Sequence, residues 1–165
     1  MAKGEATEGA KTRSATIQNR KARHDYEILE VFEAGIALQG SEVKSLRAGQ
    51  VQMRDAYARV EDGEVWLVGL HVSPYSNAVG FGAHDPDRRR KLLLHRRQID
   101  QLDSQVNEQR LTLVPLSIYW KDGKAKVELA VGRGRKSYDK RHAIAKRDQD
   151  RDTAREYGTQ RGRDR

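Results

Sequence analysis

The uneven distribution of charge and apolar residues along the chain most limits what it can fold into. Residues 1–23 carry a net charge of +4 and residues 133–165 one of +6, whereas residues 24–132 are nearly neutral at −2. The only large apolar residues in the last segment are Tyr138, Ile144 and Tyr157. Segments of this kind cannot bury enough surface to fold alone. The sequence therefore predicts a disordered N-terminus (1–16), one folded domain (17–132) and a basic tail (133–165) that is disordered in the free protein.

Several classes of protein do not fit this composition. The chain has no cysteine, no apolar run near the ~18 residues of a membrane span, and no apolar segment near its N-terminus that would mark a secretory signal. Its five histidines are scattered, and it contains no phosphate-binding or dinucleotide-binding loop and no nucleophile elbow. We therefore expect a soluble cytoplasmic protein that is not an enzyme, with no metal, no cofactor, no small-molecule substrate and no membrane partner.

Short runs of β-forming residues suggest a mainly β fold. Residues 26–32 are expected to form a strand that turns at Gly35 into a second strand at 36–38. Residues 56–60 and 64–68 flank a Glu-Asp-Gly turn, and residues 111–120 and 125–131 flank a Lys-Asp-Gly-Lys turn. These patterns predict a small closed antiparallel β-barrel of the OB type with about three short helices.

The helices are predicted from caps and periodicity. Ser41 is the expected N-cap of a helix over residues 42–48, which Gly49 ends. A second helix over residues 95–107 would place Ile99, Leu102 and Val106 on one face. Residues 85–86 (Asp-Pro) resemble the start of another helix, and residues 74–83 a flexible loop.

Basic clusters indicate a polyanionic partner. Residues 20–23 and 88–91 are each rich in Arg and Lys, and each could be an ordinary solvated surface or a contact with an RNA backbone. In the tail, Arg147, Arg151 and Arg155 recur every four residues with acidic residues between them. This spacing predicts a latent helix, either fluctuating in water or formed when the Arg row meets phosphates.

Four stretches, in this order, resemble the small protein B (SmpB) family, the tmRNA-binding partners in bacterial ribosome rescue. They are residues 19–26, residues 33–49, residues 90–94 and the triplet 139–141, and the resemblance extends from about residue 14 to 155. It implies an OB-like barrel with three helices that binds the tRNA-like domain of tmRNA and brings it to ribosomes stalled without a stop codon. The tail would enter the small-subunit decoding centre and the empty mRNA channel as a helix, so that the nascent chain is tagged for degradation and the ribosome released.

The resemblance also assigns candidate residues by position. Asn19, Glu33 and Leu93 fall where the family contacts tmRNA. The full predicted RNA-binding set is Asn19, Arg20, Lys21, Arg23, His24, Glu33, Lys44, Arg47, Arg90, Lys91 and Leu93. The predicted tail set is Arg133, Gly134, Arg135, Lys136, Tyr138, Asp139, Lys140, Arg141, Arg147, Arg151 and Arg155, of which 139–141 fall in the segment needed for tag-coding to start.

Two of the three body residues, Glu33 and Leu93, have two interpretations. The amide of Asn19 can donate and accept on a base edge, and Glu33, expected at a turn, can accept from a base amino group or a 2′-hydroxyl or be a plain exposed turn residue. Leu93 offers an apolar surface to an unstacked base, or belongs to the core.

The alternative function is a ribosomal or ribosome-assembly protein, which would also have basic tails. Such a protein should remain on all ribosomes through high-salt washing, whereas a rescue factor should be enriched with its RNA or on stalled complexes.

Overall fold

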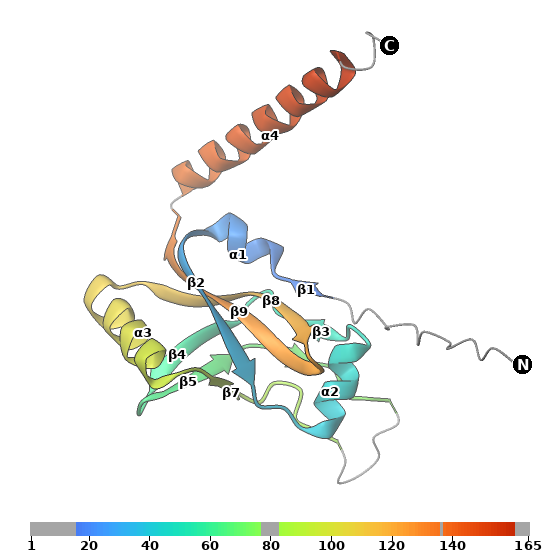
Figure 1. The fold of residues 1–165 in the computed structure, drawn as a ribbon, viewed down its shortest axis with the longest axis vertical. Coiled ribbons are helices and arrows are strands. Elements are labelled where there is room, and N and C mark those ends of the chain that lie inside the picture. Colours follow the sequence, from blue (N-terminus) through green and yellow to red (C-terminus); the bar gives the residue numbers. More distant parts are fainter. Residues whose placement is uncertain (1–15, 77–82, 136, 161–165) are drawn as a thin grey trace, which may run out of the picture.

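The computed structural model describes residues 16–76, 83–135 and 137–160, and these residues fold into a mainly β body with four helices (Figure 1). The mainly β fold class predicted from the sequence is therefore confirmed. Helix α4 projects away from the body, beginning beside helix α1 (Figure 1). Within the part of the chain that the structure describes, no helix is long and apolar enough to span a bilayer.

A seven-stranded antiparallel sheet forms the body. Its strands are β1 (Ile17–Gln18), β2 (Tyr26–Ile36), β4 (Tyr57–Glu61), β5 (Glu64–Val68), β7 (Arg90–Leu93), β8 (Thr112–Lys121) and β9 (Lys124–Gly134). They pair in the order β1-β8-β4-β5-β7-β2-β9, and β9 also pairs with β8. The pairings thus lead from β8 through five further strands and back to β8. Strands β3 (Val51–Gln52) and β6 (His71–Val72) form a separate small sheet.

Three helices pack on the body: α1 (Arg20–Asp25), α2 (Gly40–Arg47) and α3 (Arg96–Gln109). The helix that projects away, α4, spans Ser137–Gln160. Leu46 of α2 and Leu102 of α3 are fully buried in the main core, together with strand residues such as Leu67 and Leu129. A second, smaller core lies under α1, where Ala22 packs with Val114, Leu116 and Ala130. Both faces of strands β8 and β9 therefore bury side chains.

Local sequence signals predicted two hairpins and two helices correctly. Strands β4 and β5 pair up to Glu61 and Glu64, and β8 and β9 pair up to Lys121 and Lys124. The two residues between β8 and β9, Asp122 and Gly123, have φ of 51° and 74°, as a tight hairpin turn requires. Helix α2 and the apolar face of α3 are confirmed as well.

The turn predicted at Gly35 is wrong. Strand β2 continues through Gly35, which pairs with Lys126 on one side and Leu93 on the other. A Cβ atom at Gly35 would lie 3.2 Å from the Cβ of Leu93. Glycine at this position therefore allows strands β2 and β7 to lie close together. Glu33, two residues earlier, lies within strand β2 and not at a turn.

Two predicted helix starts are also wrong. The N-cap of α2 is Gln39, whose backbone N–H donates to Glu42 at 2.7 Å, while the hydroxyl of Ser41 hydrogen-bonds His84 at 2.8 Å. Asp85 begins a turn, accepting from the N–H of Asp87 at 3.0 Å, because strand β7 starts only a few residues later.

Three further expectations concern segment boundaries. The predicted disordered N-terminus falls almost entirely on residues 1–15, and most of the predicted loop falls on residues 77–82; both lie outside the described residues. Helix α1 was not predicted. Strand β9 extends through Arg133 and Gly134, past the predicted start of the tail, because these residues pair with Glu27 and Tyr26.

Candidate nucleic-acid interface

Glu33 and Leu93 lie together on the outer surface of strands β2 and β7. Leu93 is directly opposite Gly35, and residues two apart on a strand point to the same face, so Glu33 shares that face. The side chain of Leu93 is 53% exposed. It lines a cavity of about 410 Å³ together with Trp120, Lys124 and Lys126. We call this surface, defined by Glu33, Leu93 and the cavity, the β2–β7 face.

Glu33 is held by donors from strand β8. The hydroxyl of Tyr119 donates to Glu33 Oε2 at 2.5 Å, and Lys121 Nζ lies 3.3 Å from both carboxylate oxygens. The hydrogen bond from Tyr119, aided by Lys121 and Lys126, outweighs desolvation and lowers the pKa of Glu33. Conversely, burial and the neighbouring carboxylate raise the pKa of Tyr119 to about 12. At neutral pH the face therefore presents a fixed carboxylate flanked by lysines.

The predicted basic residues of α2 and β7 stack on aromatic rings or pair with acids. The ammonium of Lys44 lies 5.2 Å from the ring centre of Tyr75, and the guanidinium of Arg47 lies 4.9 Å from that of Trp120. Because Trp120 lines the cavity, Arg47 stacks on a residue at the border of the β2–β7 face. Lys91 points outward and pairs with Glu64 at 2.5 Å.

Arg90 is inside the protein. Its side chain and that of Glu42 are both 0% exposed, and Arg90 Nε donates to Glu42 Oε1 at 2.8 Å. The remaining guanidinium nitrogens of Arg90 donate to the backbone carbonyls of Leu70, Arg88 and Pro86. The side chain of Arg90 is therefore not accessible from the protein surface, whereas the RNA contact predicted for it requires an accessible side chain.

Glu42 is the acceptor at the centre of this cluster. Burial alone would raise the pKa of its carboxyl, but hydrogen bonds from Arg88 and the Gln39 backbone and the charge of Arg90 together lower it. Arg88 donates through Nε at 2.9 Å and through Nη2 at 2.6 Å. The cluster thus joins the first turn of α2 to the start of β7.

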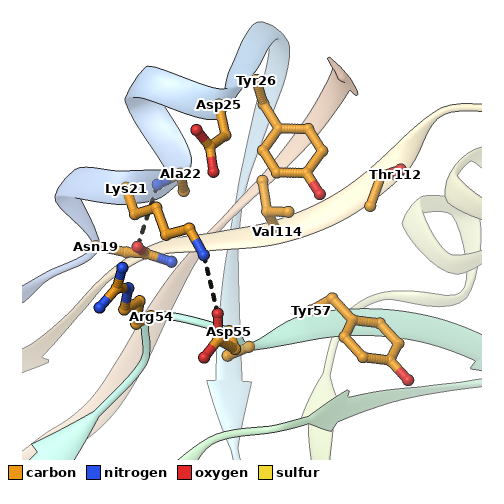
Figure 2. A pocket seen from close by; sticks show the side chains of 11 residues that line it. Asn19, Lys21, Ala22, Asp25, Tyr26, Arg54, Asp55, Tyr57, Thr112 and Val114 are labelled. Atoms are coloured by element: carbon orange, nitrogen blue, oxygen red, sulfur yellow. Dashed lines mark hydrogen bonds and ion pairs between the residues drawn. The ribbon is translucent and has the colours of Figure 1, made fainter. Parts of the chain in front are cut away.

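Asn19 is buried at the start of α1. Its Oδ1 accepts from the N–H of Ala22 at 3.2 Å (Figure 2). Its Nδ2 donates to the carbonyls of Met53 and Pro115 at 3.0 and 3.1 Å. These bonds use both ends of the amide to fix α1 against the body. Asn19 lines none of the β2–β7 cavity, so the structure does not bring it together with Glu33 and Leu93.

The other predicted residues of α1 lie on the surface. Lys21 pairs with Asp55 at 3.0 Å, Arg23 approaches Glu128 at 3.5 Å, and His24 Nδ1 lies 2.9 Å from its neighbour Asp25. Arg20 is exposed. Helix α1, which carries these side chains, lies at the end of the body where α4 begins (Figure 1).

The tail residues divide between strand and helix. Arg133 and Gly134 belong to β9, and the N–H of Arg135 donates to the carbonyl of Asp25 at 2.9 Å. Lys136 lies outside the described residues. Tyr138, Asp139, Lys140 and Arg155 lie in α4, and Arg141, Arg147 and Arg151 are exposed on it. Disorder of this segment in the free protein stays a prediction.

Comparison with known proteins assigns the chain to a family. A family model described as SmpB protein matches residues 16–159. The chain belongs to the SmpB protein family. The SsrA-binding protein of Oleidesulfovibrio alaskensis is 58% identical over 139 residues, covering 84% of this chain and 89% of that protein. The SsrA-binding protein of Frankia casuarinae is 53% identical over 151 residues, covering 92% of each chain.

A solved structure also resembles this SmpB-family chain. It is described as "tmRNA-SmpB: a journey to the center of the bacterial ribosome". Its chain is 52% identical, and the superposition has a TM-score of 0.62 over 74% of this chain and 85% of the other.

Some residues of the β2–β7 face were not predicted from the sequence. Tyr119, Lys121 and Lys126 surround Glu33, and Trp120 lines the cavity beside Leu93. The sequence contained part of the information needed to find these residues, because the 121–124 turn places Tyr119 opposite Lys126. Their proximity to Glu33, however, depends on how β2 pairs with β9, which the SmpB resemblance alone does not specify. Among the described residues, no group of three or more possible ligands could hold a metal ion.

Proposed function

We propose that this protein binds the tRNA-like domain of tmRNA and brings it to ribosomes stalled without a stop codon. The observation that carries the proposal is the SmpB family match over residues 16–159, supported by relatives called SsrA-binding proteins. A structural relative described in terms of tmRNA, SmpB and the bacterial ribosome supports the same partners. The protein would act in the cytoplasm as an RNA-binding factor and not as an enzyme.

The β2–β7 face is the proposed contact with tmRNA. Leu93 is an exposed leucine beside a cavity, which suits an unstacked base, and Arg47 and Lys91 supply positive charge around it. The carboxylate of Glu33, already fixed by Tyr119, can accept from a base amino group or a 2′-hydroxyl without reorganising. Asn19 would contribute by positioning α1, and the proposed contact excludes Arg90.

The body that carries this face is proposed to be an OB-like barrel. Support comes from the strand pairing, which leads from β8 through β4, β5, β7, β2 and β9 back to β8. A closed cycle of antiparallel strands leaves no long sheet edge among those six strands and holds the outer face rigid.

The tail is proposed to act on the ribosome. It would be disordered in the free protein and form a helix in the decoding centre and empty mRNA channel, consistent with the helical span of α4. Arg141, Arg147 and Arg151 are exposed on this helix and could meet rRNA phosphates.

The test separates the body from the tail. Because Arg135 is tied to Asp25 and β9 ends at Gly134, the chain should be truncated after Arg135 rather than inside the strand. This truncation removes ten basic and six acidic residues. The matched variant replaces Asp139, Lys140 and Arg141 with alanine in the full chain. Filter binding measures affinity for a tRNA-like tmRNA fragment, and a peptide-tagging assay uses ribosomes programmed with stop-less mRNA.

We expect both variants to retain most of the affinity for tmRNA and to lose tagging. A Leu93→Ala variant should instead fold normally and bind the tmRNA fragment more weakly. Normal tagging by the truncated protein, or complete loss of tmRNA binding on truncation, would contradict this division of function.

A further inference from the structure

A hollow lies between helix α1 and the start of strand β4, away from the β2–β7 face (Figure 2). It has a volume of about 220 Å³, and its lining includes Lys21, Tyr26, Arg54, Asp55, Tyr57 and Thr112. No residue lines both this hollow and the cavity beside Leu93. We call it the α1–β4 hollow.

One side of the hollow is aromatic. Figure 2 shows the rings of Tyr26 and Tyr57 on the side near Thr112, with Val114 next to Tyr26. Tyr57 is 40% exposed, so its ring is accessible to a ligand from solvent. Exposed aromatic rings of this kind are the platforms on which proteins stack the unpaired bases of single-stranded RNA.

The opposite side is a basic ridge. Lys21 pairs with Asp55 at 3.0 Å. Arg54, which lines this hollow, and Arg20, which lines only the neighbouring one, are exposed and have no ion-pair partner among the residues that the structure describes. Beyond the ridge lies a second hollow of about 410 Å³, and Asn19, Lys21 and Arg54 line both. An RNA backbone could therefore pass over the ridge with its phosphates near Arg20 and Arg54.

The volume limits what the α1–β4 hollow can hold. Sites for drug-sized ligands span roughly 300–1,000 Å³. A single planar base fits this space, whereas a complete nucleotide would leave its ribose and phosphate outside, on the ridge.

We propose that the α1–β4 hollow binds one unstacked nucleobase of single-stranded RNA against Tyr57 and Tyr26, with the flanking phosphates on Arg20 and Arg54. This is a second RNA contact, and it rests on the proposed function only in taking RNA as the partner. Because α1 is in contact with α4, the bound RNA would lie next to the beginning of the tail.

The test uses the full-length protein and a six-nucleotide RNA with 2-aminopurine, a fluorescent base quenched by stacking, at its centre. Tyr57→Ala should weaken binding about tenfold, as expected for loss of one base–aromatic stack, while Tyr57→Phe keeps the ring and should change affinity by less than about twofold. Arg54→Ala should lower the slope of log affinity against log salt by about one. Arg97→Ala, an exposed arginine on α3, is the matched charge control and should leave quenching unchanged. Thermal unfolding of each variant checks that it is folded.

Two further titrations identify the source of the base and separate this proposal from the proposed function. A tRNA-like tmRNA fragment and isolated small ribosomal subunits are each titrated with the wild type and with Tyr57→Ala, and the RNA whose affinity falls is the source. If the wild type fails to bind the tmRNA fragment but the 2-aminopurine result holds, the proposed function fails and the nucleobase site stands. If Tyr57→Ala quenches 2-aminopurine with the same affinity as the wild type, the nucleobase site is overturned.

Discussion

Replacing Glu42 with glutamine should destabilise the fold strongly although it changes almost no volume. Glu42 is fully buried and accepts from Arg88, from Arg90 and from the backbone of Gln39. The substitution leaves the buried guanidinium of Arg90 without a counter-charge, and breaking such a pair typically costs about 3–5 kcal/mol. Glutamine keeps one acceptor oxygen, so we expect the lower end, about 3 kcal/mol. That is a large fraction of a typical domain stability of about 5–15 kcal/mol.

Urea unfolding followed by circular dichroism measures this loss, and a thermal scan should show a melting temperature about 10 °C lower. The matched control is Glu64→Gln. Glu64 also pairs with a basic residue, Lys91, but both side chains are about 40% exposed. An exposed pair contributes about 0–1 kcal/mol, so the control should change little.

The dependence on pH supplies an independent check. Because the pKa of Glu42 in the folded protein is lowered from its ordinary value of 4.5, its stabilising contribution is fully present above that value. The contribution is lost as pH falls through the folded pKa. The stability difference between wild type and Glu42→Gln should therefore be constant near neutral pH and shrink in acid below pH 4.5.

A double-mutant cycle shows whether the buried pair is the cause. Once Arg90 is replaced with methionine, Glu42→Gln should cost markedly less than in the wild type, because the two residues are in direct contact. A loss below about 1 kcal/mol for Glu42→Gln, or strict additivity in the cycle, would refute the reasoning.

Two further predictions concern the RNA-binding and tail regions. Glu33→Ala should weaken binding of a tRNA-like tmRNA fragment at fixed salt although it removes a negative charge, and tighter binding would reject specific recognition by this carboxylate. Amide exchange in the free protein should be fast across residues 144–156 of α4, because the helix has few apolar residues to pack, and strong protection there would exclude a disordered tail.

Much of the fold could be predicted because its signals are local. The Asp-Gly turns of the β4–β5 and β8–β9 hairpins depend on two residues that adopt positive φ, and these appear directly in the sequence. The apolar spacing in α3 likewise encodes the face that buries Leu102. The features that were wrong depend on distant residues instead. The sequence around Gly35 predicts a turn, and only the pairing with Leu93 on the neighbouring strand shows that this glycine lies within a strand.

The site shows the same division between local and distant information. The family resemblance led to Glu33 and Leu93, and the strand pairing shows that they share a face. Residue type could not reveal that the amide of Asn19 is already committed to Ala22, Met53 and Pro115. A polar residue in a functional motif can thus position a neighbouring element instead of contacting RNA. Its hydrogen-bond partners show which of these two functions it has.

Along strand β7, residues that point into the core alternate with residues on the proposed RNA-binding face. A loss of RNA binding alone therefore does not show whether a variant removed an RNA contact or disturbed the fold. Arg90 and Leu92 point into the core, whereas Lys91 and Leu93 point outward. Lys91→Ala should therefore lower RNA affinity and reduce the salt slope by about one, because a phosphate contact releases a counterion. Arg90→Met, measured where the protein is still folded, should leave the salt slope unchanged and lower the free energy of unfolding instead. Equal slopes for the two variants, both below that of the wild type, would mean that Arg90 reaches the RNA and that its burial against Glu42 is not the state that binds.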